Sequence, residues 1–334
     1  MSNITSNGIR MINKKYDEIM LLFAFIGQIR RLEKIVNPIF IIGIKGSLHI
    51  IDLCLKFIPN RVNVILILAG MDEWEIDWAK KHLCVSGYIV LDKQLKHGAI
   101  LDLLFKCRKS NFGIMDYDLF ISNPIYFDLM RSINSNSIGN VLFMYEDPNL
   151  HVKIPQTFFM FFNALMVRSI MQRFDVSCSV AKYEELSQRV KSKLQSINFD
   201  GRNMPEGNFG KDYFDTFRLI SLLGLADGYE FNWVNDSIES GLNESGVFHV
   251  SGISNPAEVK NRWRRRGSFF WQRSLALHPD LNLRTHYQQL FPNLPTVHDL
   301  EQLLRNDGYT GSWYFDSVNE LLKSFGRGNI SGEV

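Results

Sequence analysis

The sequence predicts an α/β protein with a mixed, mostly parallel sheet flanked by helices and followed by a C-terminal helical extension. Short apolar runs recur through the first half of the chain, and longer segments with helical spacing separate them. Strands that alternate with helices in this way are typical of βαβ units, whose strands are parallel and buried on both faces. The second half departs from this rhythm, and beyond residue 256 the pattern is helical.

The apolar runs of the first half predict five strands, at Pro38–Ile44, Val62–Leu68, Gly87–Leu91, Phe112–Met115 and Val141–Tyr145. Apolar residues at helical spacing, together with capping residues and Pro124, predict a helix before each strand or between them. These helices are expected at Tyr16–Val36, Leu48–Phe57, Glu73–Leu83, Lys96–Lys109 and Ile125–Ile133. In such sheets, ligands bind beyond the carboxyl ends of the strands, so polar residues at those ends are the first candidates for a site.

The second half is expected to contain shorter elements. Its predicted helices are Tyr183–Ser196 and Asp212–Leu225, and its predicted strands are Tyr229–Val234 and Val247–Ser251. A loop rich in Gly, Asn and Pro over Asn198–Lys211 is the candidate for a mobile segment over the site.

Charge and hydropathy exclude several classes of protein. The chain has 37 Lys and Arg against 35 Asp and Glu, a net charge of +2, so no global field favours nucleic acid. A membrane-spanning helix needs about 20 apolar residues in a row, and the runs seen here are much shorter. The N-terminus lacks the charged-then-apolar order of a signal peptide. We therefore expect a cytoplasmic location, with the inner face of the membrane as an alternative.

The strongest chemical signal is Asp116-Tyr117-Asp118 at the end of the fourth predicted strand. Side chains two residues apart lie on the same side of an extended chain, so both carboxylates can turn toward one hard cation. Such a cation neutralises the charge that develops on a diphosphate leaving group. Because acid pairs are also common in surface turns, the spacing alone leaves a solvated turn as an alternative reading.

The order of several motifs resembles nucleotide-sugar glycosyltransferases of the GT-A fold, especially the inverting family-2-like group. The segments are His97–Leu104, which leads into Phe112–Asp118, then Tyr213–Thr216 and Val247–Ser254. The resemblance covers roughly residues 36–255. The turn that follows the first strand, Ile44-Lys45-Gly46-Ser47, departs from the family's Thr- and Asn-rich turn.

The resemblance implies a role for each matching residue. A divalent cation, Mn²⁺ or Mg²⁺, would be bound by Asp116, Asp118 and His249 of the DxD-type site. Donor contacts would come from Gly43, Lys45, Gly46, Lys96, His97 and Asp116. The general base of an inverting transfer would be a carboxylate, in the order of preference Asp215, Asp212 and Glu146. Structural alternatives stay open: a tight turn at Lys45, a helix cap at His97, a core histidine at His249 and a helix-dipole contact at Asp215.

The segment Lys260–Trp271 is the main basic patch, with aromatic residues among and after the arginines. Arginine forks match phosphate oxygens, so the patch is a candidate clamp for the donor diphosphate. A second functional reading is contact with anionic lipid, with Trp263, Phe269, Phe270 and Trp271 at the interface. A third is nucleic-acid binding by charge and stacking, which the net charge of only +2 disfavours. A solvated helix face is the structural alternative. The residues concerned are Arg262, Arg264, Arg265 and Arg266.

These observations together predict a metal-dependent glycosyltransferase for polysaccharide biosynthesis. It would move a sugar from a nucleotide-diphosphate donor, with a UDP-sugar preferred, to a hydroxyl of a glycan, glycolipid or protein, with inversion. The chain would divide into an N-terminal helix (1–35), a donor-binding half (36–150), an acceptor-binding half of the same domain (151–255) and a helical cap (256–334). The alternatives are a Rossmann-like methyltransferase or nucleotide-binding enzyme, and a non-catalytic glycosyltransferase-like binding module.

Overall fold

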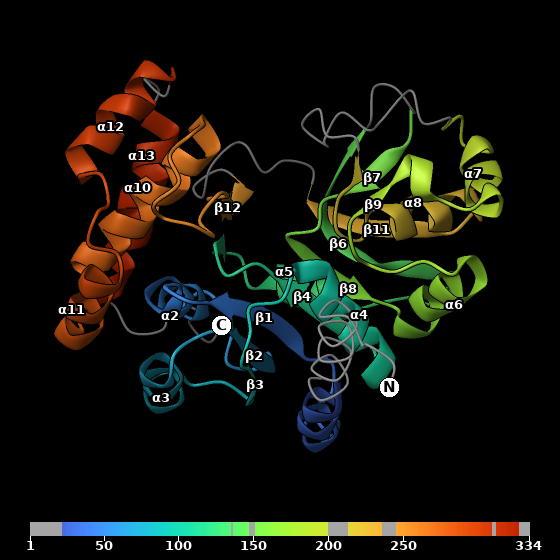
Figure 1. Cartoon of the computed structure of the whole chain (residues 1–334), viewed down its shortest axis with the longest axis horizontal. Coiled ribbons are helices and arrows are strands. Elements are labelled where there is room, and N and C mark those ends of the chain that lie inside the picture. Colours follow the sequence, from blue (N-terminus) through green and yellow to red (C-terminus); the bar gives the residue numbers. More distant parts are fainter. Residues whose placement is uncertain are drawn as a thin grey trace, which may run out of the picture.

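A mixed sheet of eight strands forms the centre of the molecule (Figure 1). The computed structural model describes residues 22–134, 136–146, 151–199, 213–235, 245–308 and 312–326. The strand order is β11-β6-β8-β4-β1-β2-β3, with β7 paired to β6, and the neighbours within the runs β4-β1-β2-β3 and β6-β11 are parallel. β8 runs antiparallel to both β4 and β6. The predicted α/β class is therefore confirmed.

The strands of this sheet agree closely with the apolar runs. β3 begins and ends as predicted, whereas β6 is longer than predicted. Their bounds are β1 Ile39–Ile44, β2 Val64–Ala69, β3 Gly87–Leu91, β4 Phe112–Met115, β6 Ser137–Glu146, β7 Lys153–Pro155, β8 Phe159–Phe162 and β11 Glu230–Asn235.

Two hydrophobic cores lie on the two faces of the sheet. Alternate residues of one strand enter different cores, as the pleat requires: Ile41 belongs to one cluster and Phe40 to the other. The first core also contains residues of α2 and α10, and the second contains residues of α4, α6 and α8. Burial on both faces explains why these strands are apolar throughout instead of alternating.

The helices that cover the sheet are mostly shorter than their apolar periodicity predicts. Asp72 begins α3 with a capping box, in which its side chain accepts from the Glu75 amide and the Glu75 side chain accepts from the Asp72 amide. Residues 22–31 are helical, and the first part of the predicted Tyr16–Val36 helix lies outside the described residues. The bounds are α2 Leu48–Leu55, α3 Glu73–His82, α4 His97–Cys107, α5 Ile125–Arg131, α6 Ala164–Phe174, α7 Gln188–Gln195 and α8 Arg218–Ala226.

Two small sheets connect segments that are far apart in the sequence. β5 (Leu119–Ile121) pairs antiparallel with β12 (Val247–His249), and the sequence reasoning did not predict β5. β9 (Ala181–Lys182) pairs with β10 (Tyr213–Phe214). The expectation that a helix begins near Tyr213 was wrong, because this residue lies in a strand and α8 begins at Arg218.

The C-terminal helices lie beside α2, and α10 packs against it (Figure 1). Tyr287 of α11 donates a hydrogen bond to the buried carboxylate of Glu75 (2.9 Å) and accepts one from the Leu48 amide (3.1 Å). Within the described ranges, every helix is too short or too polar to cross a bilayer. The bounds are α10 Arg262–Leu277, α11 Leu281–Leu290, α12 Val297–Asn306 and α13 Ser312–Leu322, with 3₁₀ turns at Tyr183–Glu185 and Lys323–Gly326.

Candidate functional site

Asp116 and Asp118 lie where β4 ends, as the sequence predicts. The Asp116 amide donates to the Phe158 carbonyl (2.8 Å), and its carbonyl accepts from the Leu119 amide (3.3 Å), which closes a short turn. Tyr117 and Asp118 are buried, whereas Asp116 is partly exposed. Asp118 leads directly into β5, and its carbonyl accepts from the Val250 amide just after β12 (3.1 Å).

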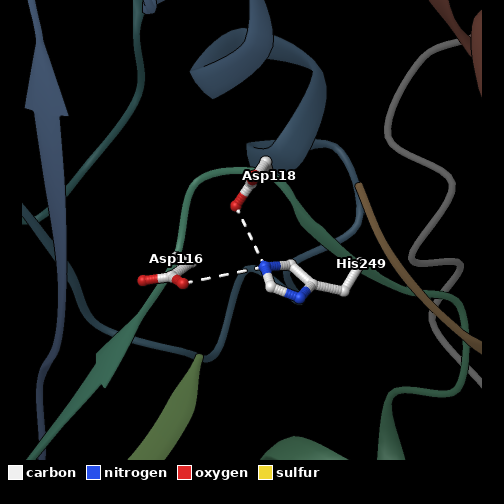
Figure 2. Close-up of side chains that lie close together, drawn as sticks. All are labelled: Asp116, Asp118 and His249. Atoms are coloured by element: carbon white, nitrogen blue, oxygen red, sulfur yellow. Dashed lines mark ion pairs between the residues drawn. The ribbon is translucent and has the colours of Figure 1, made fainter. Parts of the chain in front are cut away.

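His249 reaches this pair because β12 lies beside β5, with His249 opposite Leu119 in the register. Its Nε2 lies 3.3 Å from an Asp118 carboxylate oxygen and 3.7 Å from an Asp116 carboxylate oxygen. Figure 2 shows the imidazole with Nε2 directed at both acids. One ligand atom from each residue lies within 4.8 Å of the others. Two carboxylates and an imidazole form a donor set that suits a divalent cation.

Burial and neighbouring charges shift the pKa of Asp116 and of His249. Burial and the neighbouring Asp118 charge raise the pKa of Asp116 to about 7, while His249 acts in the opposite direction. Burial alone would lower the pKa of His249, but the two carboxylates outweigh burial and raise it. Because its pKa is raised, His249 is protonated more readily than a free histidine, and the protonated ring offsets part of the negative charge of the two carboxylates.

The trio lines a cleft with a volume of about 380 Å³. Lys96 and His97, at the start of α4, lie on the wall of the same cleft. Burial lowers the pKa of His97 to about 4, partly offset by the charge of Asp215, so this imidazole is neutral at pH 7. The other lining residues are Ile42, Ile44, Gln94, Leu95, Tyr117, Ser251, Gly252, Ile253 and Ser254. Five of the predicted residues are thus brought together: Lys96, His97, Asp116, Asp118 and His249.

Gly43, Lys45 and Gly46 do not line this cleft. The Gly46 amide donates to Glu75 (2.7 Å) and its carbonyl accepts from Trp271 Nε1 (2.7 Å). A Cβ on Gly43 would meet an Ile51 methyl group at 2.6 Å, and Lys45 pairs with Asp72 at 3.5 Å. Gly46 has φ +86°, where glycine is favoured. The contacts of this turn are with the protein itself, and donor contact here stays a prediction.

The predicted arginine patch is mostly engaged within the protein. Nη1 of Arg265 donates to both carboxylate oxygens of Asp307 (2.6 and 2.8 Å). The Arg266 guanidinium is buried and donates to the His249 carbonyl (3.3 Å). Arg264 donates to the Ser254 hydroxyl on the cleft wall (2.7 Å). The Arg262 guanidinium lies 5.0 Å from the Trp263 ring centroid.

Three of the aromatic residues expected on a lipid surface are core residues instead. Phe269, Phe270 and Trp271 are at most 4% exposed. They lie on the inner face of α10 and belong to the first hydrophobic core. This part of the lipid-contact hypothesis is wrong, because these side chains pack against other parts of the protein. Phe269 packs against Phe315 of α13, and Trp271 packs against His49 of α2.

The three candidate bases have different settings. Asp215 lies between β10 and α8, and its negative charge partly opposes the lowering of the His97 pKa by burial. The Thr216 amide donates to the Asp215 carboxylate (2.8 Å). Glu146 ends β6 and is exposed. Asp212 lies outside the described residues. Neither Asp215 nor Glu146 lines the cleft, but the charge of Asp215 acts on His97 at the cleft wall.

Sequence reasoning did not assign roles to several residues of the cleft. Tyr117 lies between the two acids, Gln94 precedes α4, and Ser251 follows β12. Ser251 Oγ lies 3.2 Å from Nδ1 of His249. Ser251 was already part of the quoted Val247–Ser254 motif, and its distance of two residues from His249 was the available signal.

Comparison with known proteins adds the following likenesses. Residues 17–167 match the family described as the StrH glycosyltransferase N-terminal domain. The matched stretch contains Asp116 and Asp118 and ends before His249. The curated dTDP-dihydrostreptose–streptidine-6-phosphate dihydrostreptosyltransferase of Streptomyces griseus is 26% identical over 91 residues. That likeness covers 27% of this chain, and the chain spans about a quarter (24%) of that relative's length. Both sequence matches support the predicted glycosyltransferase class.

Solved structures of glycosyltransferases also align with the chain. The glycosyltransferase GlyE of Streptococcus pneumoniae TIGR4 is 12% identical, with a TM-score of 0.38, over 72% of this chain and 62% of that chain. The mannosyltransferase PcManGT of Pyrobaculum calidifontis, in complex with GDP-Man and Mn²⁺, is 10% identical, with a TM-score of 0.36, over 97% of this chain and 87% of that chain. At these scores, the fold class rests on the strand order and helices of this chain itself.

Proposed function

We propose that the protein is a metal-dependent glycosyltransferase that moves a sugar from a nucleoside-diphosphate donor to an acceptor hydroxyl. The observation that carries this proposal is the convergence of Asp116, Asp118 and His249 in one cleft at the carboxyl ends of the parallel strands. The sequence match over residues 17–167 supports the reaction class. The GT-A assignment and the inverting outcome belong to the same proposal.

The three side chains fit a divalent cation by the chemistry of their donor atoms. Carboxylate oxygens bind Mn²⁺ and Mg²⁺, and an imidazole nitrogen favours Mn²⁺ over Mg²⁺. A bound cation would neutralise charge on the diphosphate as the sugar–phosphate bond breaks. Asp116, Asp118 and His249 would hold it, and we therefore prefer Mn²⁺ as the resident ion.

The other residues of the cleft would act on the donor and the acceptor. The exposed Lys96 ammonium provides a positive charge at the cleft wall for a donor phosphate oxygen. Neutral His97 can donate a hydrogen bond to a sugar hydroxyl or accept one from it, without adding charge to the cleft. Of the four arginines of the basic patch, we propose Arg264 as a phosphate contact, because it donates to Ser254 on the cleft wall.

In the transfer step, the acceptor oxygen would attack the anomeric carbon while the bond from that carbon to the phosphate oxygen breaks. The bonding electrons leave with the diphosphate, and the hydroxyl proton passes to a carboxylate base. We propose Asp215 as this base because of its link to the cleft through His97. A single displacement of this kind inverts the anomeric centre.

The donor that we propose carries a pyrimidine nucleotide. The sequence resemblance favours a UDP-sugar, and the name of the Streptomyces griseus relative specifies a dTDP-sugar. UDP and dTDP share a pyrimidine base and a diphosphate, so one site can accept either with small changes around the base and the ribose. A glycan or lipid-linked hydroxyl compound would be the acceptor.

A donor panel tests this proposal. The purified protein is incubated with UDP-, dTDP- and GDP-sugars in Mn²⁺, Mg²⁺ or EDTA, and release of nucleoside diphosphate is measured with and without a pool of glycan acceptors. We expect release from a pyrimidine donor in Mn²⁺, at least 100-fold less in EDTA, and a similar loss in Asp118→Asn. Equal release in EDTA would contradict metal dependence, and stabilisation by S-adenosylmethionine instead would favour the methyltransferase alternative.

A further inference from the structure

The loop after β12 holds His249 in an unusual way. Ser251 has φ +63°, in the left-handed region that serine rarely adopts, and Gly252 follows with φ +75°. This backbone turns the Ser251 side chain back toward the strand, and its Oγ lies 3.2 Å from Nδ1 of His249. Strained residues of this kind persist where the surrounding structure holds them, and they cluster at functional sites.

Helix α10 supplies the support that holds this loop. Arg264 donates to the Gly252 carbonyl (3.3 Å), and Arg266 donates to the His249 carbonyl (3.3 Å). Gly267 faces the loop so closely that a Cβ there would meet the Gly252 carbonyl carbon and oxygen at 2.5 Å. The Phe158 ring packs against the His249 ring, and the two ring centroids are 4.7 Å apart. His249 is thus contacted at its backbone carbonyl by Arg266, at its ring face by Phe158 and at Nδ1 by Ser251.

We infer that Ser251 is the positioning residue that keeps Nε2 of His249 directed at the Asp116 and Asp118 carboxylates. This inference rests on the metal site of the proposed function. A hydroxyl is suited to this position because it both donates and accepts. A neutral imidazole with its proton on Nε2 can accept at Nδ1 from Ser251. An imidazolium, or an imidazole whose Nε2 binds a cation, can instead donate from Nδ1–H to Ser251. The imidazole then changes partners without rotating.

Partners of this kind tune a metal site without touching the ion. Replacing them commonly lowers metal affinity by about 10- to 100-fold. Two variants separate the hydroxyl from the backbone. Ser251→Ala removes the hydroxyl and keeps the left-handed strain, whereas Ser251→Gly removes the hydroxyl and relieves the strain. Ser268→Ala is the matched control, because it removes a buried serine hydroxyl that bonds the Pro256 carbonyl (2.7 Å) and does not contact His249.

The experiment measures Mn²⁺ binding by calorimetry and records pulsed electron paramagnetic resonance of the bound ion, which detects a coordinated imidazole nitrogen. His249→Ala gives the reference without that nitrogen. We expect the wild type and Ser268→Ala to bind Mn²⁺ with nitrogen coupling. Ser251→Ala and Ser251→Gly should both bind about 10- to 100-fold more weakly, with the coupling reduced. Melting temperature, measured without metal, should not fall in Ser251→Gly.

The outcomes that overturn the inference differ from those that overturn the proposed function. Wild-type affinity and nitrogen coupling in both Ser251 variants would overturn the role of the hydroxyl while leaving the metal site intact. Loss of affinity in Ser251→Gly alone would also overturn it, because backbone stiffness would then be the cause. A wild-type protein that binds no Mn²⁺, or binds it without nitrogen coupling, would overturn the proposed metal site and this inference with it.

Discussion

Two carboxyl groups meet at the end of β4, and the imidazole of His249 lies against both. Asp116 and Asp118 both lie within 4 Å of Nε2 of His249, at 3.7 and 3.3 Å. The residue types and the two-residue spacing of the acids could be predicted from the sequence, because a strand end places such side chains on one side of the chain. The approach of His249 came only from the family resemblance, since no local pattern connects residues so far apart in the chain.

At the same scale, His97 should make stability depend on pH. Its folded-state pKa of about 4 lies below the ordinary value of 6.5, so the unfolded chain binds the proton first as pH falls. Its contribution to stability is therefore complete above pH 6.5 and is lost between pH 6.5 and 4, by at most about 1.4 kcal/mol per pH unit. Chemical denaturation at pH 7.5 and pH 5 should show a larger loss in the wild type than in His97→Gln. Equal losses would contradict a depressed pKa.

The choice of base is also a residue-scale prediction. Asp215→Asn should lower kcat by about 10²- to 10⁴-fold, because the acceptor proton loses its destination, and should leave the donor KM nearly unchanged. Glu146→Gln, at the exposed end of β6, should lower kcat much less. Steady-state kinetics of the two variants decide which carboxylate is the base. A larger loss of kcat in Glu146→Gln than in Asp215→Asn would contradict the choice of Asp215 and favour Glu146.

At the scale of elements, the short strand β5 joins the two halves of the site. The apolar triplet Leu119-Phe120-Ile121 follows Asp118 at once, and its pairing with β12 places His249 opposite Leu119. The long strands of the sheet were predictable because burial on both faces makes them apolar throughout. β5 was not, because three residues carry no periodicity and the strand forms only by pairing with a segment that lies far along the chain.

The contact between α10 and the His249 loop should be sensitive to one methyl group. Gly267→Ala would drive a Cβ against the Gly252 backbone at 2.5 Å, so we expect a loss of about 1–3 kcal/mol in unfolding free energy and weaker Mn²⁺ binding. Gly27→Ala is the control, since nothing lies within 4 Å of that helical glycine. It should raise stability by about 0.5–1 kcal/mol and leave Mn²⁺ binding unchanged. Identical effects on metal binding in the two variants would contradict the packing argument.

At the scale of the whole molecule, the C-terminal helices share a core with the sheet. Leu283, Leu300 and Tyr314 belong to the same buried cluster as β1 and β2 residues. The sequence predicted the helices and a cap-like segment from residue 256, but it could not show where that segment packs. The contacts of Tyr287 with Glu75 and Leu48 bridge more than 200 positions along the chain, and no local pattern encodes such a distance.

This shared core predicts one cooperative unfolding transition in calorimetry. Tyr287→Phe should lower the unfolding free energy of that single transition by about 1–3 kcal/mol, because it leaves the buried Leu48 amide without the hydroxyl that accepts its hydrogen bond. It also removes one of three hydrogen bonds that the Glu75 carboxylate accepts, and the bonds from the Gly46 and Asp72 amides remain. Tyr126→Phe, which removes a longer 3.3 Å bond to Ser245 in a less buried place, should lower it less. Two separate transitions, with only one of them shifted by Tyr287→Phe, would mean that the helices fold as an independent unit.

We propose that Asp116, Asp118 and His249 bind one divalent cation. Anomalous diffraction at the manganese edge, from crystals soaked in MnCl₂, tests it most directly. We expect one strong anomalous-difference peak within coordination distance of all three side chains, and no such peak in Asp118→Asn crystals. A wild-type map without that peak, with His249 still paired to the two carboxylates, would contradict the account.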